Sequence, residues 1–233
     1  MTESTNTGTS TEASAARRRV RLSVLVAGGL LVAYHLFVRP WHLDWGATDD
    51  EMDRELPADE LVPAPSSETT RAVTVEAPSD EVWPWIVQLG QGRGGFYSYS
   101  WLENLVGADI HNVDRIVPEF QRLAEGDSIR MVKEDYWLRS PMTSMTVEKV
   151  DPGRTLVLRG HDGGTWTFHL EPRDDETTRF VVRGRAPQQS LLGRIVRYLA
   201  YELPHFVMER GMMRGIKTRA ERTGRTGDDL SLA

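Results

Sequence analysis

The sequence contains no cysteine, and lysine is scarce. Without cysteine the chain cannot form disulfide bonds, thiolate metal sites or a cysteine nucleophile. Only three of the 28 basic residues are lysines (Lys133, Lys149 and Lys217), a bias that we attribute to genomic base composition. The 34 acidic residues give a net charge of −6, which argues against a nucleic-acid-binding protein. Hydrophobic residues make up 39% of the chain, enough for a folded core.

Long apolar runs are absent except for one near the N-terminus. Leu22–Val38 is free of charged side chains and follows a cluster of four arginines at positions 17, 18, 19 and 21. As a helix these 17 residues span roughly 25 Å, close to the thickness of a hydrocarbon core. We therefore predict a disordered leader with a basic end at 1–19 and a transmembrane helix at 20–39.

Two alternatives to a single-pass anchor stay open. A cleaved signal peptide would need a small-residue cleavage site, and no clear one follows the apolar run. A buried core helix would accommodate Gly28, Gly29 and His35, but not the basic cluster before them. The arginines favour a cytoplasmic N-terminus, which places residues 41–233 outside the cytoplasm.

The remainder divides into a linker, a domain and a tail. Residues 40–69 are rich in acids and hold four prolines, yet their apolar side chains predict that part of this linker packs on the domain. We predict the folded domain at 70–222 and a disordered tail at 223–233. The sequence carries no prediction of oligomeric state.

Within the domain, alternating apolar and polar residues predict strands. The candidates are 71–76, 127–132, 143–150, 155–159, 165–170 and 178–185. Trp166 shares a face with Phe168 and Leu170, as Phe180 does with Val182, which predicts an antiparallel meander with one buried face. Helices are predicted from Ser79 to Gly90, around 101–106, and from Ser190 to about Arg222, with a kink at Pro204.

Two stretches carry a resemblance to a known superfamily. They are Thr70-Arg-Ala-Val-Thr-Val-Glu-Ala-Pro-Ser-Asp-Glu-Val-Trp-Pro-Trp-Ile-Val-Gln-Leu-Gly90 and Gly92-Arg-Gly-Gly-Phe-Tyr-Ser-Tyr-Ser-Trp-Leu-Glu-Asn104. Together with the element order they resemble the START-like, or SRPBCC, superfamily in its polyketide cyclase/dehydrase-like branch. The resemblance covers roughly residues 70–221. It implies an α+β helix-grip fold, in which an antiparallel sheet wraps a long C-terminal helix and leaves an apolar cavity between them.

The glycine-rich loop after the first domain helix is one candidate wall of that cavity. Gly90, Gly92 and Gly95 match a dinucleotide-binding spacing, but the loop follows a helix instead of a strand, so we reject nucleotide binding. Nearby polar groups could move a proton or simply pair with one another at the surface. The candidate ligand-binding residues here are Arg93, Phe96, Tyr97, Tyr99, Trp101 and His111, with Glu103, Asp109 and Asn112 close in sequence.

The C-terminal helix supplies a second candidate wall. Tyr201, His205, Met208 and Met212 recur along one helical stripe. If the stripe faces the cavity it offers two methionines, an imidazole and a phenol; otherwise it is ordinary core. The six histidines form no metal-binding pattern, so we predict no metal site and no cofactor.

Three functions are compatible with these observations. We favour a membrane-tethered domain that binds a small hydrophobic or amphipathic ligand, lipid-like or polyketide-like. An alternative is a cyclase or dehydratase that uses tyrosine and histidine as acid–base groups in the same cavity. A third is an interaction module without a ligand. A dry internal cavity favours the binder, converging polar groups with shifted pKa values favour the enzyme, and a filled core favours the interaction module.

Overall fold

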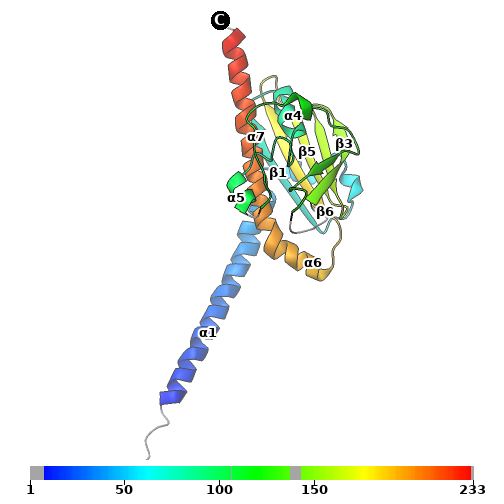
Figure 1. Ribbon diagram of the computed structural model, residues 1–233. Helices are drawn as coiled ribbons and strands as arrows, with labels where there is room; N and C mark the ends of the chain where they lie inside the picture. The colour runs from blue at the N-terminus through cyan, green and yellow to red at the C-terminus, as the bar shows by residue number, and fades with distance from the viewer. Residues whose placement is uncertain (1–7, 106, 137–142, 232–233) are drawn as a thin grey trace, which may run out of the picture. The chain divides into compact units, whose positions relative to one another are not determined.

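The structure, a computed structural model, describes residues 8–105, 107–136 and 143–231, and the side chains of 17–105, 107–136 and 143–223. The chain divides into two compact units, Met1–His42 and Leu43–Ala233. Figure 1 shows the succession of elements along the chain.

The N-terminal unit is helical. Helix α1 (Gly8–Ala33) continues through a π-helical turn (Tyr34–Val38) into α2 (Arg39–Leu43). The stretch Arg17–Leu43 has a mean hydropathy of 1.8 in its most apolar part and is long enough to cross a membrane. The helix begins at Gly8, inside the segment predicted as a disordered leader.

The second unit contains a six-stranded antiparallel sheet, as the sequence predicts. The strands are β1 (Ser67–Val75), β2 (Ser128–Arg130), β3 (Ser144–Asp151), β4 (Thr155–Gly160), β5 (Thr165–Pro172) and β6 (Thr178–Ala186). Their order is β1-β6-β5-β4-β3-β2, so consecutive strands pair from β2 to β6 and β1 closes the far edge against β6. A bulge between Val147 and Lys149 interrupts the pairing of β3 with β4.

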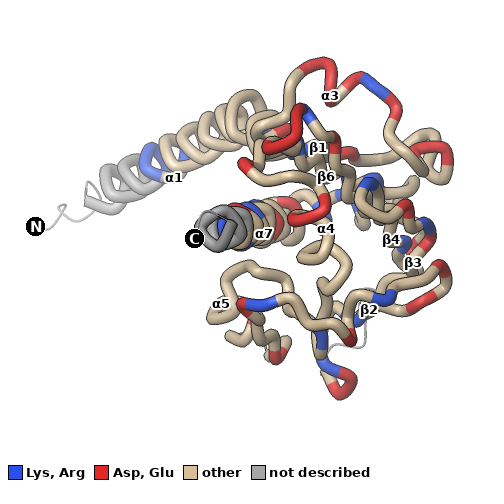
Figure 2. Tube along the Cα trace, turned by 90° about the horizontal axis from the view of Figure 1, so that it is seen from above, with Lys and Arg blue, Asp and Glu red and all other residues tan. Residues whose placement is uncertain are grey.

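Helices α4 (Ser79–Val87) and α7 (Glu202–Ser231) cover the inner face of this sheet. Short elements complete the unit: α3 (Asp49–Asp53), α5 (Ser100–Leu105), α6 (Leu191–Val196) and 3-10 turns at Asp59–Leu61 and Pro118–Phe120. The core between sheet and helices is formed by Trp85, Ile86, Phe168, Phe180, Met213 and Ile216, among others. This α+β helix-grip architecture is the one that the resemblance implies, and Figure 2 shows the strands on one side of α7.

The C-terminal helical segment contains an irregular turn before the predicted kink. A π-helical turn (Arg197–Tyr201) separates α6 from α7 and ends shortly before Pro204. Proline has no N–H to bond the carbonyl four residues earlier, so Pro204 leaves the Ala200 carbonyl without its helical donor and the helix widens ahead of it. Helix α7 continues to Ser231, into the segment predicted as a disordered tail.

The outer face of the sheet is also covered, which corrects the expectation of one buried face. Leu56 packs there against Ala72 and Val181, and residues 43–66 form a layer over it. Arg183 on β6 is 2% exposed and donates five hydrogen bonds, to Thr70 Oγ1, Asp59 Oδ2 and the carbonyls of Glu51, Met52 and Arg54, at 2.6–3.1 Å. A guanidinium has five N–H donors, so this buried charge is fully satisfied.

Candidate functional site

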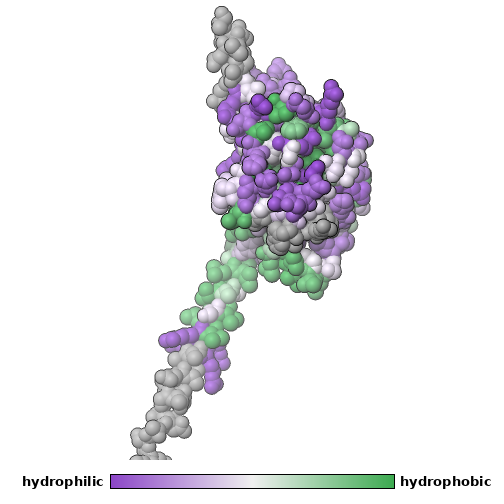
Figure 3. Space-filling view, viewed as in Figure 1, coloured by the Kyte–Doolittle hydropathy of each residue, from purple (hydrophilic) through white to green (hydrophobic). Residues whose placement is uncertain are grey.

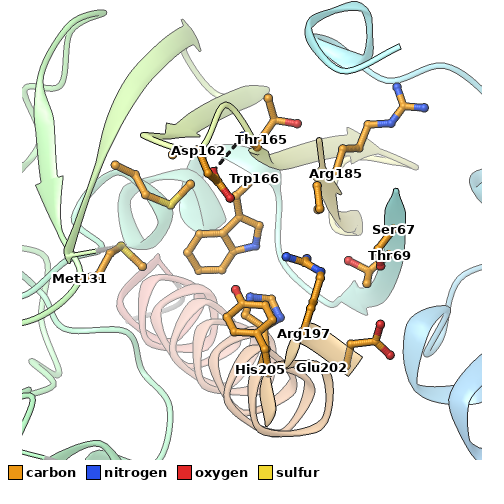
Figure 4. Close-up of a pocket in the computed structure, with 16 residues that line it drawn as sticks. Ser67, Thr69, Met131, Asp162, Thr165, Trp166, Arg185, Arg197, Glu202 and His205 are labelled. Atoms are coloured by element: carbon orange, nitrogen blue, oxygen red, sulfur yellow. Dashed lines mark hydrogen bonds between the residues drawn. The ribbon is translucent and has the colours of Figure 1, made fainter. Parts of the chain in front are cut away.

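A cavity of about 160 Å³ lies between the inner face of the sheet and the start of the C-terminal helical segment. Strands β1, β3, β4, β5 and β6 form one wall, and residues 197–205 form the other. The lining residues are Ser67, Thr69, Met131, Met145, Gly160, Asp162, Gly164, Thr165, Trp166, Gly184, Arg185, Ala186, Arg197, Tyr201, Glu202 and His205. Figure 4 shows the indole of Trp166 at the centre of this group.

Small residues on the inner face of the sheet explain why space remains here. Trp166 pairs in register with Gly184, and Gly160 and Ala186 also line the cavity. Further along the same strands, the inner face carries Leu158 and Val182, which fill the core completely. The loss of side-chain volume toward one end of the sheet therefore opens the cavity at that end.

The lining has an apolar part and a polar part. Met131 lies on one side of Trp166, and Ser67 and Thr69 lie on the other (Figure 4). The Arg185 side chain points away from the cavity and pairs with Glu68. Arg197 and Glu202 come from the helical wall. Such a lining suits a ligand that has an apolar body and a polar group.

Behind the helical wall lies a buried charged cluster. Arg71 on β1 and Glu209 on α7 form an ion pair in which each side chain is only 1% exposed. The other oxygen of Glu209, Oε1, accepts a hydrogen bond of 2.6 Å from the Trp166 indole. His205 Nδ1 lies 3.5 Å from Arg71 Nη1. The pair thus holds Trp166 and His205, two walls of the cavity, in fixed positions.

Two titratable side chains of the cavity, Tyr201 and His205, stay uncharged near neutral pH. Burial lowers the pKa of His205 to about 4, outweighing the attraction of Glu209. Burial also raises the pKa of Tyr201 to about 12. The two rings stack with centroids 4.9 Å apart, and the Arg197 guanidinium lies over the Tyr201 ring at 4.9 Å. They therefore present a neutral imidazole and a phenol to the cavity.

Of the candidate residues on the C-terminal helix, Tyr201 and His205 line this cavity and Met208 and Met212 do not. Met212 is 1% exposed and belongs to the core. The backbone carbonyl of Met208 accepts a hydrogen bond from Ser98 Oγ at 2.8 Å. Met208 and Met212 lie outside the cavity because the helix continues past the cavity's end, to a part of the sheet that carries large side chains.

None of the six candidates in the glycine-rich loop lines the cavity. Phe96 and Tyr97 are core residues, whereas Tyr99, Trp101 and His111 are exposed. The Tyr97 hydroxyl accepts a hydrogen bond of 2.6 Å from Gln88, and burial raises its pKa to about 12. Arg93 donates to the carbonyls of Val87 and Phe120 at 3.0 and 2.8 Å. These hydrogen bonds hold the loop against the core and occupy the polar groups of Arg93 and Tyr97.

The residues that sequence reasoning missed are mainly on the sheet. Trp166, Gly184, Ala186 and the two cavity methionines, Met131 and Met145, were not candidates. A signal for them exists in the strands, since glycine and alanine at inward positions 184 and 186 break the pattern of large apolar residues. The Arg71–Glu209 pair leaves no such signal, because its members are 138 positions apart.

A second, more open cavity lies on the outer face of the sheet. It is lined by Arg54, Glu55, Leu56, Pro57, Asp151, Arg154, Thr155, His169 and Glu171. Its charged lining contrasts with the apolar lining of the first cavity. Within the described part of the chain, no group of three or more His, Asp or Glu side chains is arranged to hold a metal ion.

The sequence matches no protein-family model and no curated protein. Solved structures similar to this chain include the self-sacrificing resistance protein CalC of Micromonospora echinospora, at 15% identity over 67% of this chain and 95% of that one, with a TM-score of 0.41. A norcoclaurine synthase point mutant of Thalictrum flavum is 13% identical over 68% of this chain and 96% of that one, with a TM-score of 0.42. A polyketide-cyclase-like protein of Corynebacterium glutamicum is 16% identical over 66% and 86%, with a TM-score of 0.31. The helix-grip architecture is evident from this chain's own strand order and helix packing.

Proposed function

We propose that this protein binds a small amphipathic molecule in the cavity between Trp166 and His205. The observation that carries the proposal is the cavity itself, about 160 Å³ of space with a largely apolar lining. An apolar cavity of about 150 Å³ in a protein core admits a molecule the size of benzene. The apolar body of the ligand is therefore about one ring or a short branched chain.

Two buried polar atoms in the cavity support the proposal that the ligand carries a polar group. Ser67 Oγ and Arg197 Nε are buried, and neither has a hydrogen-bond partner among the described residues. Buried polar atoms in folded proteins are nearly always hydrogen-bonded. Ser67 and Arg197 both line the cavity, so a ligand with an acceptor such as a carbonyl or carboxylate oxygen complements them.

An acid–base enzyme is the second candidate, because Tyr201 and His205 lie together in the cavity. An efficient general base has a pKa near the working pH. The His205 pKa of about 4 is too low for this at neutral pH, and the Tyr201 pKa of about 12 keeps its proton in place. Both residues suit hydrogen bonding to a ligand better than proton transfer, so we favour binding.

The helix at Arg17–Leu43 supports a membrane location for this activity. We propose that it spans the membrane once, with the arginine cluster in the cytoplasm and the folded unit outside it. A ligand taken from, or delivered to, the bilayer fits both the tether and the apolar lining. The tether then keeps the ligand-binding unit close to the bilayer that supplies or receives the ligand.

A cavity-filling variant tests the binding proposal. In Met131→Trp the larger side chain should occupy the cavity, so small molecules that co-purify with the full-length protein should be lost. Mass spectrometry of an organic extract measures this loss. Met208→Trp is the matched control, because Met208 lies outside the cavity lining. If the parent protein and both variants carry the same extractable molecules, or none, the binding proposal is wrong and the interaction-module alternative stands.

A further inference from the structure

An aliphatic surface on the C-terminal helical segment faces solvent. Its seven side chains are 37–72% exposed, although each is a large apolar group. We call this surface the aliphatic stripe, and its members are Leu191, Leu192, Ile195, Val196, Leu199, Leu203 and Val207. Figure 3 shows green, hydrophobic side chains over the part of the domain where Figure 1 labels α6. A contiguous apolar patch of this kind marks an interaction surface.

The stripe lies on the side of the helix that faces away from the cavity. Each of its seven members is exposed, and none of them lines the cavity. Arg197, Tyr201 and His205 from the same segment do line it, and so does Glu202, which is 6% exposed. One short helical segment therefore has one side on the ligand cavity and the other exposed.

Chain connectivity ties the end of the apolar helix to the folded unit at Trp45. Leu43 is the last residue of the apolar helix, and Trp45 follows two positions later. Trp45 is held on the folded unit, where its ring packs edge-on against Phe206 at 6.4 Å and its carbonyl accepts a hydrogen bond of 3.1 Å from Ala72 N. Phe206 is the sequence neighbour of Val207, a member of the stripe.

This short connection limits how far the stripe can lie from a bilayer. Two extended residues span at most about 7 Å. Leu43, the last residue of this helix, therefore lies within roughly that distance of Trp45. Arg39, the end of the predicted membrane span, lies about 6 Å further along the helix. A domain held so closely cannot rise far from the lipid surface.

We propose that the aliphatic stripe lies in the interfacial layer of the bilayer that holds the anchor, so that the cavity wall from Arg197 to His205 is in contact with lipid through its opposite side. The inference rests on the proposed membrane anchor and not on the identity of the ligand. Arg194, which is exposed on α6, would place its guanidinium among lipid phosphates.

Spin labels on the full-length protein test this inference, and the absence of native cysteine makes each introduced cysteine unique. The protein is reconstituted in vesicles of phosphatidylethanolamine and phosphatidylglycerol, with a nitroxide at Leu199→Cys in the stripe, Leu30→Cys in the anchor or Thr218→Cys on an exposed part of α7. Collision with oxygen, which concentrates in the bilayer, is compared with collision with a water-soluble nickel complex. The label at 199 should favour oxygen as the label at 30 does, whereas the label at 218 should favour nickel.

Each other outcome overturns the inference in a distinct way. If the label at 30 is in lipid but the label at 199 collides with nickel, the anchor is correct and the docking is wrong. If the label at 199 is shielded from both reagents and shows spin–spin broadening, the stripe binds a second copy of the chain. If the label at 30 itself is in water, the anchor proposal fails and the docking fails with it.

A charge placed in the stripe gives an independent measurement. Leu199→Glu should shift a nitroxide at Leu192→Cys from oxygen-accessible to nickel-accessible, because a carboxylate opposes interfacial burial. Thr218→Glu is the matched control and should leave that label unchanged. Both sites are exposed, so neither substitution should disturb folding. A label at 192 that stays in lipid with Leu199→Glu would contradict the proposed contact.

Discussion

Glu103 on α5 is a carboxyl group that the fold keeps partly out of water. Its Oε2 is buried and has no hydrogen-bond partner among the described residues. Burial raises its pKa from 4.5 to about 7. The folded chain therefore binds a proton more tightly at this side chain than the unfolded chain does, and the ionised form destabilises the fold.

We predict that Glu103→Gln stabilises the protein above pH 7. Between pH 4.5 and 7 the folded state holds more protons at this site, so its stability should fall as pH rises through this window. The amide of glutamine does not titrate, so above pH 7 the variant should have a higher melting temperature than the parent protein. The expected gain in the free energy of unfolding is roughly 2 kcal/mol, after allowance for the partial exposure of the side chain.

Glu119→Gln is the control for this prediction, because Glu119 is exposed. The two Gln variants and the parent protein are compared by thermal unfolding at pH 5 and pH 8. A Glu103→Gln gain of equal size at both pH values would show that ionisation is not the cause.

His205 illustrates how far a residue's environment changes its chemistry. A histidine in water titrates near pH 6.5, whereas burial, helped by the nearby charge of Arg71 and opposed by Glu209, lowers the pKa of His205 to about 4. Burial would raise the pKa of Glu209, but Arg71, His205 and the Trp166 hydrogen bond outweigh it and lower that pKa. The carboxylate is therefore charged and the imidazole neutral at pH 7.

At the scale of elements, strand β6 connects the two layers that cover the sheet. Its inward residues Phe180 and Val182 join the core, and its outward arginines bind residues 43–66. Arg179 forms two hydrogen bonds with the Glu51 carboxylate, at 2.7 and 2.8 Å. Burial would raise the pKa of Glu51, but these bonds and the backbone N–H of Thr48 lower it to about 2.

We predict that Arg183→Lys strongly destabilises the folded unit. Lysine has three donors and a compact ammonium group, so it cannot serve the five acceptors that surround Arg183. Breaking a buried charged network of this kind typically costs about 3–5 kcal/mol. Urea unfolding of the full-length protein in detergent measures the difference.

Arg159→Lys on β4 is the matched control. The Arg159 side chain is 39% exposed and forms an ion pair with Glu148. This substitution should cost about 1 kcal/mol or less. Equal losses for the two variants would show that the buried network around Arg183 adds nothing beyond a surface ion pair.

At the scale of the whole molecule, charge is distributed unevenly along the chain. Residues 1–40 hold five arginines and two glutamates, a net charge of +3, which leaves −9 on residues 41–233. The arginine cluster precedes the apolar helix, and Arg39 follows it. Four arginines on one side against one on the other set the expected orientation.

We predict that the C-terminus lies outside the cytoplasm. Alkaline phosphatase fused after Ala233 should be active in a bacterial host, because this enzyme matures only outside the cytoplasm. A fluorescent protein that folds only in the cytoplasm, fused at the same position, should be dark. The opposite pair of results would reverse the orientation.

The sequence by itself determined the features that depend on neighbouring residues. Alternation in segments such as 165–170 and 178–185 located the strands, and the uncharged run from Leu22 to Val38 located the apolar helix. Helical spacing also brought Tyr201 and His205 to one side of the C-terminal segment, where both line the cavity. These patterns are visible because the residues that produce them are at most a few turns apart.

Only the tertiary structure decided where the cavity lies and what surrounds it. Its position depends on the register that sets Gly184 opposite Trp166 and on the part of α7 that crosses that end of the sheet. The Arg71–Glu209 pair and the layer over Arg183 join segments more than a hundred residues apart. Packing of distant segments sets the free volume and the partners of buried charges, so local spacing carries little information about either.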